Sequence, residues 1–171
     1  MTYRHIIRTL GMAVLLATSL AGAGPCDGPD HRAFDFWVGE WDVYGKNGKL
    51  AGTNTITREY NSCVIHEHYS TPRGYSGESF NMYDAGRKIW HQTWVDSTGT
   101  LLLLDGGVQD GKMVLEGSAV AKNGKPIKHR ITFTPNPDGT VRQFWQSAGE
   151  DGDWKTAFDG LYRPSEATAT P

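Results

Sequence analysis

Short runs of alternating apolar and polar residues, each closed by a turn signal, make up the chain from Gly39 onward. Runs rich in β-branched and aromatic residues are typical of strands. Nine turns separate them, and Asn47-Gly48 and Asn123-Gly124 favour tight hairpins because both residue types tolerate positive φ. The pattern predicts about ten strands. One opens at Gly39, and the others cover Thr53–Tyr60, Cys63–Ser70, Phe80–Asp84, Ile89–Asp96, Thr100–Leu104, Met113–Val120, Ile127–Thr134, Val141–Ser147 and Trp154–Tyr162.

Consecutive strands joined by short turns predict an all-β fold, a single antiparallel up-and-down barrel of about ten strands. Closing the barrel removes the exposed edges that an open sheet of this size would present. A two-sheet sandwich is the main alternative, although it usually needs long crossovers that the turn spacing does not provide. The helix candidate is a short turn around His31–Val38. Gly74, Gly77, Gly106 and Gly107 are interpreted as turn or bulge positions.

The two faces of each predicted strand differ in composition, and we expect the tryptophan-bearing faces to point inward. The interior then combines aromatic rings with a few polar groups, which is typical of a small-molecule site. The expected ligand-binding residues are Glu67, Asn81, Gln92, Trp94, Gln143 and Trp145. Arg130 joins them if its face of Ile127–Thr134 points inward, where it would pair with Glu67. A filled core, in which the polar groups satisfy one another, is the alternative.

The first 23 residues have the features of a signal peptide. Arg4 and Arg8 give a positive start, Leu10–Leu20 is apolar, and Ala21-Gly22-Ala23 is a small-residue cleavage site. The apolar run is about half as long as a membrane span requires. We therefore expect an exported protein, periplasmic or extracellular, with no membrane span after signal removal. A barrel domain is expected over residues 24–163 and a flexible tail over 164–171.

Both cysteines lie in the mature part, and an oxidising compartment favours pairing them. A Cys26–Cys63 disulfide would tie the mature N-terminus to a strand and stabilise the fold by about 4 kcal/mol on the loop-entropy estimate. Two unpaired thiols are the alternative. Neither the spacing nor the neighbouring residues indicate a redox motif or a zinc site.

The charge balance argues against polyanionic partners. Without residues 1–23 the chain keeps 15 basic and 19 acidic residues, a net charge of −4. No nucleic-acid partner is expected, and anionic membrane surfaces are poor partners for such a chain. The sequence predicts no particular oligomeric state.

The sequence offers several candidate chemistries. His66 and His68 share a strand face and could reach one metal ion, but no third ligand accompanies them, and His91 and His129 lack the other marks of a haem site. No metal and no cofactor is therefore expected. The nucleophile elbow and the phosphate-binding loop are both missing from the sequence. Glu67 in an aromatic cavity could act as a general acid or base, and the alternative is a structural ion pair with Arg130.

Several segments resemble one family. Gly39-Glu40-Trp41 is similar to the Gly-x-Trp opening of the lipocalin and fatty-acid-binding superfamily, in which the tryptophan closes one barrel end; Trp41 is added to the candidate site on this basis. More closely, the chain resembles a family of exported bacterial lipocalin-like proteins of unknown function. The matching segments are Phe34–Val43, Asn81–Asp84, Gln92–Asp96, Arg130–Thr132, Val141–Trp145 and Phe158–Tyr162. The resemblance implies a calycin-type barrel and export, and it implies no reaction and no catalytic residues.

Three functions remain open on the sequence. The main hypothesis is an exported barrel protein that binds a small, partly apolar ligand. The second is a small-molecule enzyme that uses Glu67 together with Gln92, Asn81 or Arg130. The third is a structural or interaction barrel without a ligand, which predicts a filled interior and an exposed apolar patch.

Overall fold

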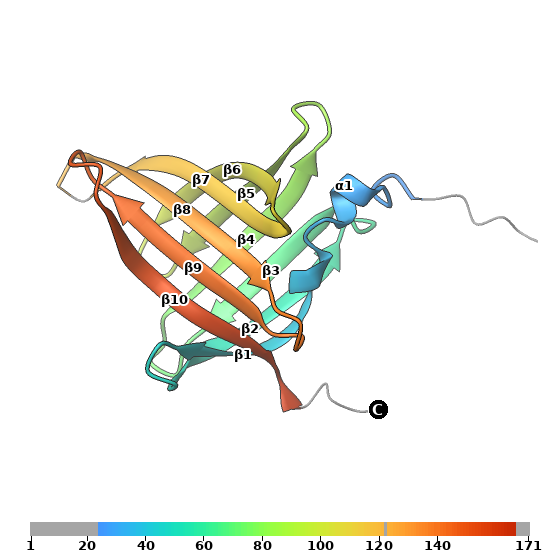
Figure 1. Ribbon diagram of the computed structural model, residues 1–171, viewed down its shortest axis with the longest axis horizontal. Coiled ribbons are helices and arrows are strands. Elements are labelled where there is room, and N and C mark those ends of the chain that lie inside the picture. The colour runs from blue at the N-terminus through green and yellow to red at the C-terminus, as the bar shows by residue number, and fades with distance from the viewer. Residues whose placement is uncertain (1–23, 122, 167–171) are drawn as a thin grey trace, which may run out of the picture.

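Ten antiparallel strands form one closed barrel in the computed structural model, which describes residues 24–121 and 123–166 (Figure 1). The predicted signal peptide, residues 1–23, and the end of the predicted tail, 167–171, lie outside the described residues. The strands are β1 Gly39–Gly45, β2 Leu50–Glu59, β3 Val64–Ser70, β4 Ser76–Asp84, β5 Ile89–Asp96, β6 Leu101–Gln109, β7 Lys112–Val120, β8 Pro126–Pro135, β9 Val141–Ala148 and β10 Trp154–Pro164. The predicted all-β barrel of about ten strands is confirmed.

Pairing between the first and last strands closes the barrel. Val43 of β1 lies opposite Tyr162 of β10, while the other edge of β1 pairs with β2. Every other strand pairs with its neighbours in sequence, so no strand keeps an unpaired edge. Strand β10 runs to Pro164, and the backbone N–H of Ser165 donates to Glu40 O at 2.9 Å. Regular structure thus extends past residue 163, the expected end of the barrel domain.

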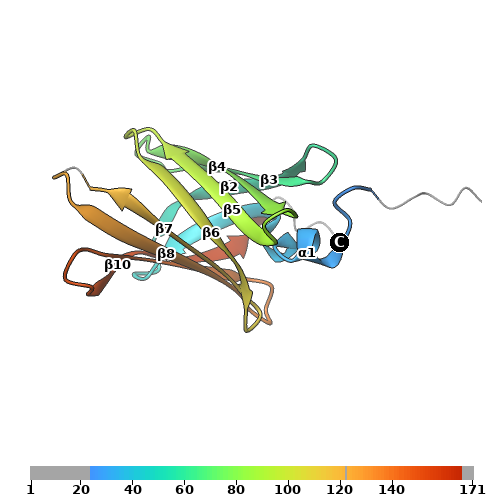
Figure 2. The same cartoon turned by 90° about the horizontal axis from the view of Figure 1, so that it is seen from above.

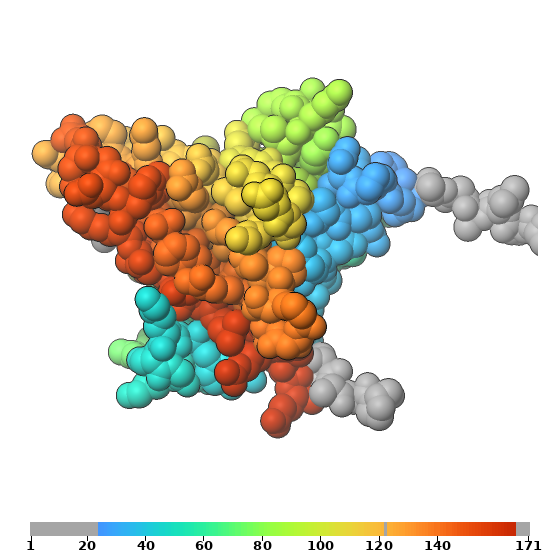
Figure 3. Space-filling model, viewed as in Figure 1, coloured from blue at the N-terminus to red at the C-terminus, as the bar shows by residue number. Residues whose placement is uncertain are grey.

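Two short helices, α1 Pro29–Arg32 and the 3₁₀ helix η1 Asp35–Trp37, lie at one end of the barrel (Figures 1 and 2). They occupy the segment where a helical turn was predicted. Figure 3 shows the same N-terminal segment packed against the body of the barrel. No helix in the described part of the chain is long and apolar enough to cross a membrane.

An aromatic plug formed by Phe34 and Trp37 fills this end of the barrel. Both side chains are fully buried, and the Trp37 ring lies 4.8 Å from the Phe34 ring and 4.6 Å from that of Phe133. The indole N–H of Trp41 donates to Trp37 O at 3.0 Å. Trp41 therefore packs at the closed end, as the resemblance implied.

A disulfide fastens the plug to the barrel. Cys26 and Cys63 are bonded, with 5.1 Å between their Cα atoms, so the predicted pairing is confirmed. The bond joins the segment before α1 to the turn between β2 and β3. On the other side of the plug, the indole N–H of Trp90 donates to Asp30 O at 3.1 Å. The N-terminal segment is thus held covalently and by hydrogen bonding at the same barrel end.

Strand parity placed the interior correctly on β3 and β5. Trp90 and Gln92 are buried on β5, and Glu67 is buried on β3. Arg130 is a correction: the buried residues of β8 are His129, Ile131 and Phe133, so Arg130 lies on the outer face. There it contacts Glu116 of β7, and its guanidinium lies 4.5 Å from the Trp154 ring centroid. It is not the partner of Glu67.

Three of the four glycines interpreted as turn or bulge positions lie in regularly paired strand segments instead. Gly77 is in β4, and Gly106 and Gly107 are in β6, whereas Gly74 is in a turn with φ of 82°. At Gly77 a Cβ atom would lie 2.3 Å from the Trp94 ring and 2.8 Å from Val95 O. A glycine is required there because the ring lies directly over the backbone.

Candidate functional site

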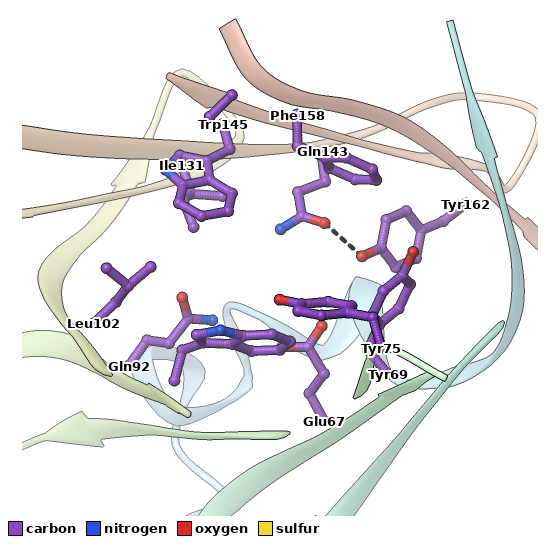
Figure 4. Close-up of a pocket in the computed structure, with 12 residues that line it drawn as sticks. Glu67, Tyr69, Tyr75, Gln92, Leu102, Ile131, Gln143, Trp145, Phe158 and Tyr162 are labelled. Atoms are coloured by element: carbon purple, nitrogen blue, oxygen red, sulfur yellow. Dashed lines mark hydrogen bonds between the residues drawn. The ribbon is translucent and has the colours of Figure 1, made fainter. Parts of the chain in front are cut away.

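A cavity of about 290 Å³ occupies the barrel half that the plug leaves unfilled (Figure 4). The plug touches the start of β5 and the end of β8, whereas the cavity is bounded by residues from the end of β5 and the start of β6 and β10. In consecutive antiparallel strands these positions lie at opposite barrel ends. The cavity is lined by Glu67, Tyr69, Tyr75, Gln92, Trp94, Leu102, Ile131, Gln143, Trp145, Ala157, Phe158 and Tyr162. The interior is therefore hollow at this end, as in the main expectation and unlike the filled-core alternative.

Five of the eight expected binding residues line the cavity: Glu67, Gln92, Trp94, Gln143 and Trp145. The other three do not. Trp41 belongs to the plugged end, and Arg130 lies outside the barrel. Asn81 is fully buried and reaches the site through its hydrogen bonds to Gln92 and Ser79.

Glu67 lies at the floor of the cavity, where two donors hold its carboxyl group. The Asn54 Nδ2 group donates to Oε1 at 2.7 Å, and the Ser79 hydroxyl donates to Oε2 at 2.6 Å. These donors project from β2 and β4, the two strands that flank β3. The Glu67 carboxyl is thus fixed in position by both neighbours.

A continuous hydrogen-bonded band extends from Glu67 in both directions. On one side, Asn81 Nδ2 donates to Ser79 Oγ at 2.8 Å, and Gln92 Nε2 donates to Asn81 Oδ1 at 2.8 Å. Asn81 Nδ2 also donates to a backbone carbonyl of β3 at 3.1 Å. Gln92 therefore has its amide nitrogen engaged beneath the cavity while its side chain remains part of the cavity wall.

On the other side of Glu67 the band crosses to β10 and β9. Asn54 Nδ2 lies 3.3 Å from the Tyr162 hydroxyl, which donates to Gln143 Oε1 at 2.5 Å (dashed in Figure 4). The Tyr162 ring also packs 6.3 Å from the Trp37 ring. Tyr162 consequently connects the plug to the cavity wall, and the band forms a polar layer between the two.

Burial dominates the electrostatics of Glu67, whose side chain is only 3% exposed. Desolvation raises the pKa of Glu67 to about 7, against the opposing effects of the hydrogen bonds from Ser79 and Asn54. Among the described residues no lysine, arginine or histidine forms an ion pair with this carboxylate. The group therefore changes charge near neutral pH.

The histidines do not form a metal site in the described part of the chain. His66 and His68 lie on the outer face, where they contact the two oxygens of Glu78 at 3.1 and 2.9 Å. His91 contacts Asp105 at 2.7 Å, also outside. His129 is buried and accepts the indole N–H of Trp145 at 3.1 Å, and its burial lowers its pKa. No group of three or more potential ligands lies within reach of one ion among the described residues.

Several residues of the site were missed by sequence reasoning. Tyr69 shares the inward parity of Glu67 and could have been found by extending that rule. Ser79 was missed because the predicted strand began at Phe80 rather than Ser76. Tyr75 lies beside a turn, and Ala157 lies at a bulge between Thr156 and Phe158, so parity could identify neither.

The closed antiparallel barrel, plugged by an aromatic cluster at one end and hollow at the other, fits a calycin-like fold. No family model matches the chain, and no curated protein is found to match it.

Replacing Gly77 by alanine should displace the Trp94 ring, because the new Cβ would lie 2.3 Å from it. We expect the free energy of unfolding to fall by about 1–3 kcal/mol, as for other overpacked sites, together with a changed tryptophan emission spectrum. Gly107→Ala is the matched control, because its Cβ would meet nothing within 4 Å. Urea unfolding of both variants tests this, and equal stability of the two would contradict the close packing at Gly77.

The raised pKa of Glu67 should make stability depend on pH. Its unfolded value is near 4.5 and its folded value about 7, so the native state holds a proton that the unfolded chain has released. The stabilisation is fully present below about pH 4.5 and is lost as the pH rises through about 7, amounting to about 3 kcal/mol.

Unfolding by urea between pH 4 and 8 measures this contribution. Glu67→Gln should lack the pH-dependent part of the free energy of unfolding that the wild type shows between about pH 4.5 and 7. Glu116→Gln removes an exposed carboxyl from the outer face and should retain that pH dependence. Parallel pH profiles for wild type and Glu67→Gln would show that Glu67 titrates normally.

Proposed function

We propose that this protein is an exported barrel protein that binds a small, partly apolar molecule in its aromatic cavity. The observation that carries the proposal is the cavity itself, about 290 Å³ of space walled by six aromatic side chains above a hydrogen-bonded polar floor. A mostly apolar wall with a few converging polar groups is typical of a small-molecule site. The polar groups of the floor are already held in place by one another, which favours recognition without rearrangement.

Export is proposed from two features. The Cys26–Cys63 disulfide suits an oxidising compartment, and residues 1–23 have the composition of a signal peptide. We also propose that the chain is a member of the exported lipocalin-like family that its Phe34–Val43 segment resembles. The fully buried Phe34 and Trp37 of that segment, which plug the barrel, support this assignment.

Filling the mouth of the cavity should abolish ligand retention. Ala157 lines the cavity at an exposed bulge of β10, so Ala157→Phe adds a ring there without disturbing a strand pair. Native mass spectrometry of protein purified from its own host should show a small molecule on the wild type and none on Ala157→Phe. Thr156→Phe, one residue away and outside the cavity lining, should retain it. A bare mass for both wild type and Thr156→Phe would count against the proposal.

Proton transfer by Glu67 is a second candidate function. It is favoured by one observation, a carboxyl with a pKa of about 7 at the floor of a cavity, since this value suits a general acid or base near neutral pH. Under this hypothesis Glu67→Gln retains a neutral bound substrate and loses its conversion, as followed by mass spectrometry of the small molecule with time. Unchanged conversion in Glu67→Gln would exclude Glu67 as the group that transfers the proton.

A further inference from the structure

The cavity lining contains acidic groups and no basic ones. Of its twelve residues, the titratable ones are Glu67 and the three tyrosines Tyr69, Tyr75 and Tyr162. None of the lining residues is a lysine, arginine or histidine. An anionic ligand would meet no counter-charge from the lining and would lie against Glu67, so the site disfavours carboxylates and phosphates.

Glu67 is a buried carboxylate for which the described chain supplies no counter-ion. Its two hydrogen-bond donors, Asn54 and Ser79, are neutral, and each carboxylate oxygen keeps a further lone pair for another donor. The histidine next to it, His66, lies on the opposite face and contacts Glu78, and it acts on Glu67 only through space, by an attraction that lowers the pKa of Glu67. Buried charges in proteins are normally paired, so an ionised Glu67 lacks a contacting positive partner, and the cavity is the side from which a ligand could supply one.

A second carboxylate lies behind the aromatic wall. Asp96, at the end of β5, accepts the Tyr75 hydroxyl at 3.0 Å and the indole N–H of Trp94 at 3.4 Å. Burial alone would raise its pKa, but hydrogen bonds from Thr98, Thr100 and Tyr75 hold the pKa well below the usual value. Asp96 is therefore charged, and it forms no ion pair among the described residues.

Aromatic rings form much of the cavity wall around Glu67. Six of the lining side chains are aromatic: Tyr69, Tyr75, Trp94, Trp145, Phe158 and Tyr162. The faces of such rings attract cations, and an aromatic cage is a common way of binding substituted ammonium groups. A neutral apolar ligand would use the rings alone, whereas a cation would use both the rings and the carboxylate of Glu67.

We propose that the ligand is an organic cation, a primary or substituted ammonium group on a small apolar body, with its ammonium group against Glu67. This inference rests on the proposed binding function and specifies its ligand class. Each of the two amides uses one atom in the polar band, and its other atom, Gln92 Oε1 or Gln143 Nε2, forms no hydrogen bond among the described residues. One acceptor and one donor thus remain for a second polar group on the ligand.

Binding of the cation should be coupled to release of the Glu67 proton. The titratable groups that face Glu67 are Tyr69 on its own strand, Tyr162 on β10 and Tyr75 before β4, while His66 lies on the outer face of β3. Burial raises the pKa of each of these tyrosines, so all three stay neutral in the physiological range. Glu67 is then the titrating group of the cavity floor near pH 7.

Three probes of nearly equal size and different charge test the inference: 2-phenylethylammonium, 2-phenylethanol and phenylacetate. Calorimetric or NMR titration of the wild type at pH 8 should show the cation binding at least tenfold more tightly than the alcohol, and no binding of phenylacetate. The affinity for the cation should fall at pH 6 as Glu67 gains its proton, whereas the affinity for the alcohol should stay within twofold.

Two variants assign the effect to the cavity carboxylate. Glu67→Gln should reduce the affinity for 2-phenylethylammonium to that for 2-phenylethanol, and Glu116→Gln, which removes the same charge from the outer face, should change neither. Binding of the alcohol or phenylacetate as tight as that of the cation would overturn the inference and leave the proposed function standing. Failure of all three probes to bind would overturn the proposed function as well.

Discussion

Closure of ten strands into one barrel is the constraint on which the rest of this structure depends. The pairing of β1 with β10 removes the last free edges, but it also encloses more space than the inward side chains of the strands can fill. The N-terminal segment fills one half of that space with Phe34 and Trp37. Its disulfide and its hydrogen bond from Trp90 then hold it there. The other half of the interior stays hollow, and this space is the cavity of the candidate site.

The polar band between plug and cavity is costly to bury and is consequently almost fully connected. Seven side chains from β2, β3, β4, β5, β9 and β10 bond to one another across the interior: Asn54, Glu67, Ser79, Asn81, Gln92, Gln143 and Tyr162. A connected network of this kind fixes the rotamers of its members. It offers no positive partner to Glu67, and the resulting high pKa makes this carboxyl the responsive group in the band.

The fold could be predicted from the sequence because its determinants are local. Turn dipeptides set the strand number, and strand parity placed Glu67, Gln92 and Trp94 inside. Parity gives no prediction where both faces carry similar residues. In β6, Leu102 and Leu104 are buried while Leu101 and Leu103 are half exposed, and the alternation of side chains gives no composition difference to detect.

The candidate site was only partly predictable because it depends on contacts between distant segments. Arg130 was ambiguous because one face of its strand is apolar while the other carries an arginine that could have paired with Glu67. The structure buries the apolar face, with His129 and Ile131. Trp41 carries a recognisable motif, yet which barrel end it occupies follows from where the N-terminal segment packs. The cavity is the space that remains after the N-terminal segment has packed into the barrel. No local sequence pattern predicts its position.

Aromatic rings and carboxyl groups occur together on both sides of the barrel wall, but the chain supplies the cation only on the outer side. Outside, the guanidinium groups of Arg130, Arg142 and Arg163 lie 4.5, 4.7 and 4.9 Å from the ring centroids of Trp154, Phe144 and Tyr44. Arg142 is also paired with Asp159, and Arg130 with Glu116. Each outer cluster thus combines a ring with a cation of the chain, and two of them add a carboxylate. The cavity has rings and the carboxyl group of Glu67 but no cation of the chain in its lining, and in the proposed complex the ligand supplies that cation.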